Sequence, residues 1–194
     1  MQFISFFLIF MLSFAIFGVN KVSTIKTVIS SLTSMYLYLT FPDNIDPIYG
    51  YYEPSLILFN FVFGYFMYEL FVAIYNKNHV TSIIHACISM CAYSFGIYGY
   101  FSKYGLFFLS YDITTIFLNM VYQSDALIWK ILFAVSFFLI RIVFGTIESI
   151  NFIKHVLSLN DNFLVLCVIV NLMFILLNYY WFYKIIKKAR RELI

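Results

Sequence analysis

The sequence has little charge: only 11% of its 194 residues are Asp, Glu, Lys or Arg, whereas 63% are hydrophobic. A soluble domain carries about 25% charged residues, so this chain lacks the side chains needed to cover a water-facing surface. The composition therefore excludes a soluble enzyme and predicts an all-α, polytopic membrane protein. The net charge of +3 does not indicate nucleic-acid binding, because most basic residues cluster at one end.

Cysteine and proline are also scarce. The cysteines Cys87, Cys91 and Cys167 fall inside predicted membrane spans, which excludes a secreted disulfide framework. The sequence has no CxxC motif, no zinc-ligand spacing and no Gly-rich phosphate loop, so we expect no cofactor and no metal site. All three prolines lie in residues 41–54, an acidic stretch without Lys or Arg, which predicts a rigid surface turn.

What the sequence has instead is a series of long apolar segments. A membrane-crossing helix needs about 20 such residues, and we expect about seven transmembrane helices. They are predicted at residues 3–19, 22–41, 55–75, 80–100, 105–122, 127–146 and 162–183. The first segment has no basic residues before it and no cleavage site after it, so it is expected to be retained. Residues 147–161 are amphipathic and are expected at the membrane interface.

The basic residues that flank these segments predict an orientation. One side of the membrane would carry eight of them: Lys21, Lys26, Lys77, Lys184, Lys187, Lys188, Arg190 and Arg191. The other side would carry only Lys103 and Lys154. We therefore expect the C-terminus to face the cytosol, or the matrix of a mitochondrion. The N-terminus and the acidic turn are expected on the opposite side.

Ionisable side chains interrupt the apolar segments at a few positions, where their cost in lipid marks them as candidate functional residues. Counting about 1.5 Å per residue places Lys26, Glu69, His85 and Lys130 in one polar layer. The same count places two more, Asp112 and Arg141, nearer the other membrane face. Complementary charges predict that Asp112 pairs with Arg141, and that Glu69 pairs with Lys26, Lys130 or His85.

Each of these residues has two interpretations. The Asp112–Arg141 pair either staples two helices together or binds substrate. Glu69 is either a satisfied packing acid or a general base, and Lys26 and Lys130 either join a polar layer or extend to the interface. His85 is the candidate for catalysis, because imidazole titrates near neutrality and can take a proton from a hydroxyl or an amine. Alternatively, it is a hydrogen-bonded packing residue.

Several short motifs follow one another in a characteristic order. They are D-P-I-Y-G at 46–50, P-S-L at 54–56, G-Y-F-M-Y-E-L at 64–70, I-I-H at 83–85, D-I-T-T-I-F-L-N at 112–119 and F-F-L-I-R-I at 137–142. In this order and spacing the motifs resemble the TLC-domain family, which includes TRAM, Lag and CLN-type proteins. The likeness is greater to the small TLC-domain-containing proteins than to the long ceramide synthases.

The resemblance implies a domain organisation and a class of function. Residues 1–20 would form an appended helix, 21–183 a six-helix barrel-like bundle around a cavity, and 184–194 a basic soluble tail. Residence in the endoplasmic reticulum is implied by the family, with the mitochondrial inner membrane as the alternative. The implied partner is a phospholipid or sphingolipid. The polar side chains that line the lipid-binding cavity would be Lys26, Glu69, Asp112, Asn119, Lys130 and Arg141.

The family's paired histidine is replaced here by His85 followed by Ala86. This departure favours a protein that binds or handles a lipid without efficient catalysis, either alone or as a subunit of a larger membrane assembly. The alternative function is an acyl-CoA-dependent N-acyltransferase, similar to ceramide synthases, that uses His85 as its base.

Overall fold

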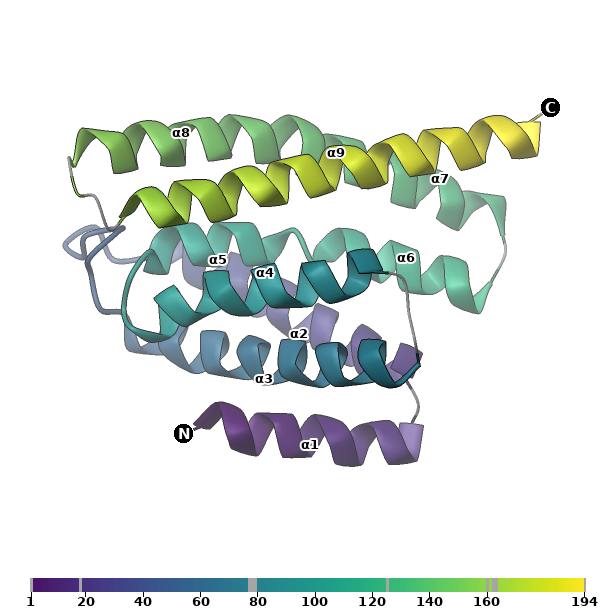
Figure 1. Ribbon diagram of the computed structural model, residues 1–194, viewed down its shortest axis with the longest axis horizontal. Coiled ribbons are helices and arrows are strands. Elements are labelled where there is room, and N and C mark those ends of the chain that lie inside the picture. Colours follow the sequence, from purple (N-terminus) through teal and green to yellow (C-terminus); the bar gives the residue numbers. More distant parts are fainter. Residues whose placement is uncertain are drawn as a thin grey trace. The chain divides into compact units, whose positions relative to one another are not determined.

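The computed structural model describes residues 2–17, 19–76, 80–124, 126–159, 161 and 164–193. Every regular element in these ranges is a helix, so the predicted all-α class is confirmed (Figure 1). In chain order the elements are α1 (Gln2–Phe17), α2 (Val19–Leu39), α3 (Glu53–Tyr75), α4 (Val80–Ile97), α5 (Ser102–Ser110), α6 (Ile113–Gln123), α7 (Leu127–Ser136), the π-helix η1 (Phe137–Phe144), α8 (Gly145–Ser158) and α9 (Val165–Leu193).

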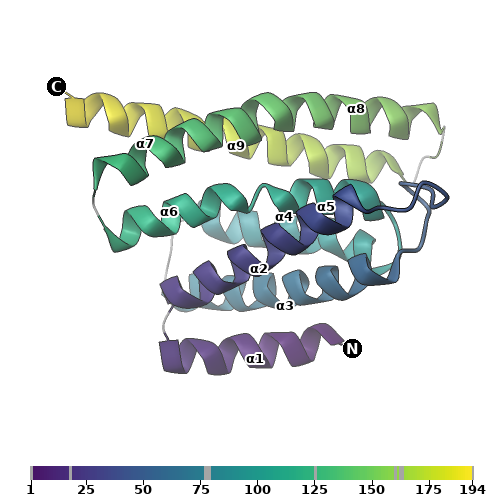
Figure 2. The same ribbon diagram turned by 180° about the vertical axis from the view of Figure 1, so that it is seen from behind.

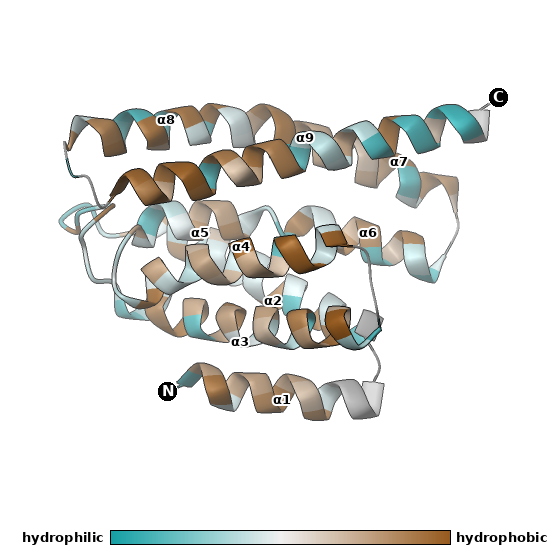
Figure 3. Cartoon of the chain, viewed as in Figure 1, coloured by the Kyte–Doolittle hydropathy of each residue, from teal (hydrophilic) through white to brown (hydrophobic). Residues whose placement is uncertain are grey.

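Within the described part of the chain, five helical stretches are long and apolar enough to cross a membrane. They are Glu53–Tyr75, Val80–Ile97, Ser102–Gln123, Leu127–Ser158 and Val165–Arg191. Their brown colour dominates Figure 3. The chain is therefore a multi-pass integral membrane protein. The two remaining helices, α1 and α2, are a shorter apolar helix and a more polar one, and membrane crossing by these two stays a prediction.

The helix that contains the sixth predicted span does not end with that span at residue 146. Helices α7, η1 and α8 follow one another without a break, so one helical stretch runs from Leu127 to Ser158, 32 residues in all. At about 1.5 Å per residue this is about 48 Å, longer than the hydrocarbon core of about 30 Å. The amphipathic residues 147–158 therefore continue the preceding helix, and their location at the membrane interface stays a prediction.

The described helices form two compact units, Met1–Asn119 and Met120–Ile194. In the first unit α3 packs against α1, α2 and α4, and α2 also packs against α5. Figure 2 shows α2 lying obliquely over α3 and beside α5. In the second unit α9 packs against α8 and η1.

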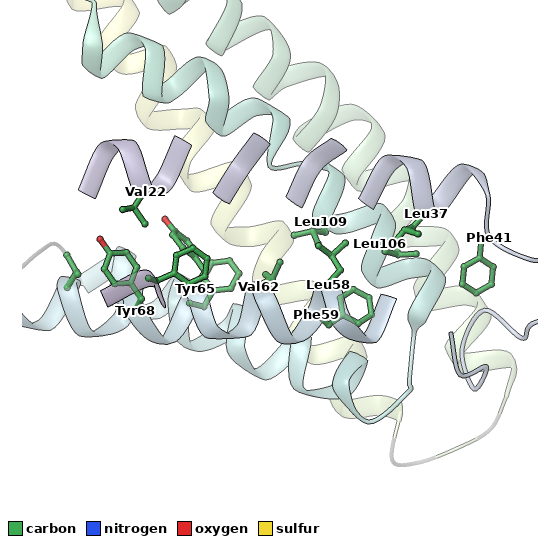
Figure 4. Close-up of a cluster of buried hydrophobic side chains, with 13 residues drawn as sticks. Val22, Leu37, Phe41, Leu58, Phe59, Val62, Tyr65, Tyr68, Leu106 and Leu109 are labelled. Carbon is green, nitrogen blue, oxygen red and sulfur yellow. The ribbon is translucent and has the colours of Figure 1, made fainter. Parts of the chain in front are cut away.

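The core of the first unit is built from aromatic and aliphatic side chains of α2, α3 and α5 (Figure 4). Phe59 of α3 is 1% exposed, and its ring lies where Gly96 of α4 and Gly105 of α5 leave space. A Cβ atom at these two glycines would come within 2.5 Å and 2.7 Å of ring atoms. The missing side chains therefore allow α4 and α5 to close around one aromatic ring.

The acidic turn lies between α2 and α3, where the prolines and Asp46 prevent a continuous helix. The Asp46 carboxylate accepts hydrogen bonds from the backbone N–H groups of Ile48 (2.8 Å) and Tyr49 (2.7 Å). The carbonyl of Ile48 in turn accepts the N–H of Phe101 at 2.7 Å, and Ile48 itself is buried. These bonds tie the turn to the connection between α4 and α5.

Candidate functional site

The centre of the candidate site is a break in a membrane-spanning helix. Residues 102–123 form one apolar stretch, but α5 ends at Ser110 and α6 begins at Ile113, so Asp112 lies at the joint. The backbone hydrogen bonds around Asp112 span three residues, as in a turn. The Asp112 N–H donates to the Leu109 carbonyl at 3.1 Å, and the Thr115 N–H donates to the Asp112 carbonyl at 2.8 Å. Non-helical backbone at membrane depth is tolerated where it is buried in protein or lines a cavity, and in secondary transporters such breaks form the binding site.

Lys26 of α2 forms a salt bridge with Asp112. Its ammonium donates to Asp112 Oδ2, and the Ser30 hydroxyl donates to the same oxygen at 2.8 Å. Lys26 is 2% exposed, so it does not extend to the interface. The depth estimate that placed Lys26 and Asp112 in different layers is wrong, because counting the rise along separate helices ignores helix tilt and the flexible four-carbon lysine stem.

Two aromatic rings of α3 complete the surroundings of this lysine. The Nζ atom of Lys26 lies 4.8 Å from the ring centroid of Tyr65 and 4.8 Å from that of Phe66. A cation over an aromatic face is attracted by the ring quadrupole, more strongly where water is excluded. The buried ammonium is thus stabilised by a carboxylate and by two rings.

Glu69 belongs to the same cluster. It follows Tyr65 by four residues on α3, which places both on one face of the helix. Because the Tyr65 ring faces the Lys26 ammonium, Glu69 lies one helical turn from the ion pair. Glu69, Lys26 and Asp112 are therefore grouped as one cluster of the first compact unit, to which α2, α3 and the α5–α6 joint each contribute one member.

Helix α2 presents two different faces. Its buried face carries Lys26, Thr27, Ser30, Ser31 and Ser34. Most of these hydroxyls bond carbonyls of the preceding turn, such as Ser31 to Thr27 at 2.6 Å, so small polar side chains can pack closely without unsatisfied groups. Its exposed face is apolar, with Ile25, Ile29 and Leu32 between 45% and 58% exposed.

Sequence analysis missed Ser23 and Ser30 as members of the site. The amide of Asn119, a predicted site residue, donates to the Ser23 hydroxyl at 3.3 Å, which brings α6 to the start of α2. The signal that would have found them is the spacing of Ser23, Thr27, Ser30 and Ser34 at three and four residues. This spacing defines one helical face.

His85 of α4 borders this cluster. Its ring meets the ring of Phe66 edge to face at 5.5 Å between centroids, and Phe66 also faces the Lys26 ammonium. The ring of Phe66 thus lies between His85, the predicted catalytic candidate, and the ammonium of the ion pair. The next residue, Ala86, is fully buried.

The remaining predicted residues, Lys130 and Arg141, lie in the second compact unit. Arg141 is part of η1, where its guanidinium lies 5.3 Å from the ring centroid of Phe137 and donates to Asn178 Oδ1 at 3.5 Å. Lys130 is half-buried on α7. The predicted pairing of Arg141 with Asp112 stays a prediction.

The arrangement in the first unit supports binding more directly than metal chemistry. Among the described residues, no group of three or more His, Cys, Asp or Glu side chains is placed to hold a metal ion. The ion pair of Lys26 and Asp112, with Glu69 nearby, provides oxygen acceptors and one buried cation inside an otherwise apolar bundle.

The family model and the relatives that match this chain all name the same domain. Residues 16–187 match the family model of the TLC domain. The chain is 29% identical over 191 residues to TLC domain-containing protein 4-B of Danio rerio, covering 84% of this chain and 70% of that protein. It is 26% identical to a putative TLC domain-containing protein of Acanthamoeba polyphaga mimivirus, covering 78% and 80%. An uncharacterized TLC domain-containing protein of Schizosaccharomyces pombe is 25% identical, with 90% of this chain and 64% of that protein covered. No solved structure matches the chain significantly.

Proposed function

The chain belongs to the TLC-domain family, and on that premise we propose that it holds a membrane lipid in its helical bundle without efficient catalysis. The observation that carries this proposal is the ion pair of Lys26 and Asp112 at a break in a membrane-spanning helix, with Glu69 on the adjoining helix α3. Ionisable groups inside a membrane are costly and usually serve a ligand or a pathway.

The exposure of these side chains indicates which headgroups fit. Lys26 is 2% exposed, whereas the side chain of Asp112 is 16% exposed and Glu69 is half-buried. A headgroup that approaches the cluster therefore meets carboxylate oxygens before it meets the ammonium. Carboxylates accept hydrogen bonds and repel anions, so the proposed ligand is a lipid with a free amino or hydroxyl group, such as a sphingoid base.

Lipid retention tests this proposal. The protein is purified in detergent, and the lipids that remain bound are extracted and identified by mass spectrometry. We expect a lipid class with a free amine or hydroxyl to be enriched, and to be lost in Glu69→Gln and Asp112→Asn. The matched controls are Glu53→Gln and Asp43→Asn, which make the same changes at exposed positions. Equal retention of that lipid class by all variants would contradict the proposal, whereas an anionic lipid retained equally by all variants would be bound outside this cluster.

A second candidate function is N-acyl transfer, and the contact of Phe66 with both His85 and Lys26 favours it. In this reaction a lipid amine attacks the carbonyl carbon of an acyl-CoA thioester. His85 takes the amine proton, and the C–S bond breaks as the proton passes to the departing CoA thiolate. The single histidine at this position makes lipid binding the leading proposal.

An activity assay separates the two functions. Purified protein in lipid nanodiscs is given acyl-CoA and a long-chain base, and amide formation is followed alongside a ceramide synthase as a positive control. The binding proposal expects no amide, and lipid retention that is unchanged in His85→Ala. Amide formation that disappears in His85→Ala would establish the acyltransferase instead.

We further propose that the C-terminus faces the cytosol, or the matrix of a mitochondrion. The support is the distribution of basic residues, because eight cations flank or enter the helices on that side and two on the other. Residence in the endoplasmic reticulum rests on the family alone, and microscopy of a tagged chain with organelle markers tests it. A role in lipid homeostasis would follow from retention of a specific lipid.

A further inference from the structure

The last helix of the chain changes character along its length. Helix α9 spans Val165–Leu193, and in Figure 3 it turns from brown at its start to teal near its end. The distance from Val165 to Lys184 is about 29 Å at 1.5 Å per residue, which matches the hydrocarbon thickness of about 30 Å. Exposed tyrosines, Tyr179, Tyr180 and Tyr183, lie at the end of this apolar part, where aromatic residues mark a membrane interface.

A dense group of cations follows the tyrosines. Five of the eight residues from 184 to 191 are basic, and all five are exposed: Lys184, Lys187, Lys188, Arg190 and Arg191. One acidic residue, Glu192, comes next in the sequence. At 1.5 Å per residue the basic residues span about 10 Å, enough to cross a headgroup layer of about 5–7.5 Å.

One exposed face of this segment borders an open space. This space of about 650 Å³, called the hollow below, is lined by α9 residues alone: Tyr183, Ile186, Lys187, Arg190 and Arg191. These residues recur at spacings of three and four, so the apolar pair lies nearer the membrane and the three cations lie beyond it. The Lys187 ammonium lies 5.9 Å from the ring centroid of Tyr183, which keeps the lysine over the hollow.

We propose that this hollow binds the phosphate headgroup of an anionic phospholipid from the leaflet in which α9 ends. Arginine guanidinium groups match phosphate oxygens with two parallel hydrogen bonds, and clusters of basic residues just outside a membrane helix attract anionic lipids. Tyr183 and Ile186 provide apolar contacts for the glycerol and upper acyl region. The partner is a lipid because α9 continues from the hydrocarbon core directly into the hollow.

This site differs from the proposed lipid site of the first compact unit. The Lys26 cluster presents carboxylates and selects hydrogen-bond donors, whereas the α9 hollow presents cations and selects anions. The two sites lie on different helices and in different compact units. The α9 proposal therefore goes beyond the proposed function, and each can fail without the other.

Tryptophan fluorescence provides the readout, because the chain has only two tryptophans and Trp181 is two residues from Tyr183. Trp129→Phe leaves Trp181 as the reporter. The full chain is placed in phosphatidylcholine nanodiscs that contain spin-labelled phosphatidylserine or, separately, spin-labelled phosphatidylcholine. Quenching of Trp181 then gives the relative association of each lipid with this end of α9.

We expect stronger quenching by phosphatidylserine. The triple change Lys187→Gln, Arg190→Gln and Arg191→Gln should reduce that preference at least tenfold, because each cation near a membrane surface contributes about fivefold. The control triple, Lys21→Gln, Lys103→Gln and Lys154→Gln, removes the same charge elsewhere and should keep the preference. Higher salt should weaken it, since exposed charges are screened.

Three results would overturn the proposal. Equal quenching by both lipids in the unchanged chain would show that no anionic lipid is selected. An equal preference in the two triple variants would show that the hollow is not responsible. Displacement of phosphatidylserine by millimolar inorganic phosphate would show that the ligand is a free anion. Because the substituted α9 residues are exposed, an unchanged melting temperature checks that the variant is folded.

Discussion

The ammonium of Lys26 in α2 is ion-paired with the carboxylate of Asp112, 86 residues later, at the joint between α5 and α6. The pair links the polar face of α2 to the break in a membrane-spanning helix. Ser30 donates to the same carboxylate oxygen, and two rings of α3 flank the lysine. The charged pair is therefore satisfied within one compact unit, which is what an ion pair in an apolar bundle requires.

A double-mutant cycle tests this pair. Removal of one partner of a buried ion pair leaves an uncompensated charge, so Lys26→Met and Asp112→Asn should each lower the free energy of unfolding by about 3 kcal/mol or more. The double change should cost clearly less than the sum, because it leaves neither charge alone. The measurement is unfolding in detergent micelles, with exposed Asp43→Asn as a near-neutral control.

The same cycle applied to Asp112→Asn and Arg141→Gln tests the pairing that the charge pattern predicts. A coupling energy above about 0.5 kcal/mol would support a direct interaction. Strict additivity would leave Lys26 as the partner of Asp112 and would show that Arg141 acts elsewhere, with Phe137 and Asn178 as its contacts.

The ring of Phe59 limits the size of its neighbours. Gly96→Ala would place a methyl group within 2.5 Å of the ring, so we expect a loss of about 1–3 kcal/mol in the free energy of unfolding. Phe59→Leu removes part of the obstruction and should partly rescue Gly96→Ala in the double variant. Unfolding by denaturant in micelles measures this coupling. If the losses of unfolding free energy from Gly96→Ala and Phe59→Leu add in the double variant, the lack of a side chain at Gly96 is not what makes room for the Phe59 ring.

Gly64 allows α1 to approach α3. A Cβ atom at this position would lie 2.8 Å from the carbonyl oxygen of Phe3 and 3.0 Å from the amide nitrogen of Phe7, both backbone atoms that cannot turn aside. We expect Gly64→Leu to force α1 away from α3 and to destabilise the protein by about 1–3 kcal/mol. Ala189→Leu, at an exposed position, introduces the same side chain as a control. Identical melting temperatures for the two variants would contradict close α1–α3 packing.

Labelling of single cysteines tests the proposed orientation. The native cysteines Cys87, Cys91 and Cys167 are replaced by alanine, and one cysteine is introduced by Asp43→Cys or by Ala189→Cys. In sealed vesicles a membrane-impermeant maleimide should reach only one of the two positions, because the five crossings predicted between them would place the acidic turn and the end of α9 on opposite sides. Labelling of both positions from one side would require an even number of crossings between them.

Sequence and structure agree best where the hydrophobic effect acts alone. Long apolar runs predict helix in a membrane regardless of their neighbours, because lipid leaves each backbone N–H and C=O to be satisfied within its own segment. The helices at 53–75 and 80–97 accordingly lie within a few residues of the predicted spans at 55–75 and 80–100. The exception is the stretch after Thr146, where an amphipathic pattern indicated a separate element and the helix simply continues to Ser158.

The chemistry of the candidate site was only partly predictable. Sequence indicated Lys26, Glu69 and Asp112 as costly residues and thus as candidates, because charge in an apolar segment is visible in one dimension. It could not show which charges meet, since depth along separate helices says little about tilt, rotation or the reach of a lysine stem. It also missed Ser30, because one serine among several on α2 carries no signal until its acceptor is known.

The sequence by itself therefore determined the class of the protein: helical, multi-pass and of the TLC-domain family, since apolar segment length and motif order are properties of a linear chain. Only the tertiary structure decided that Asp112 lies at a helix break, that Lys26 is its partner and that His85 is one aromatic ring away from them. The physical reason is that ion pairs and ring contacts depend on distances of a few ångströms between residues far apart in sequence. Those distances are set by how helices pack against one another.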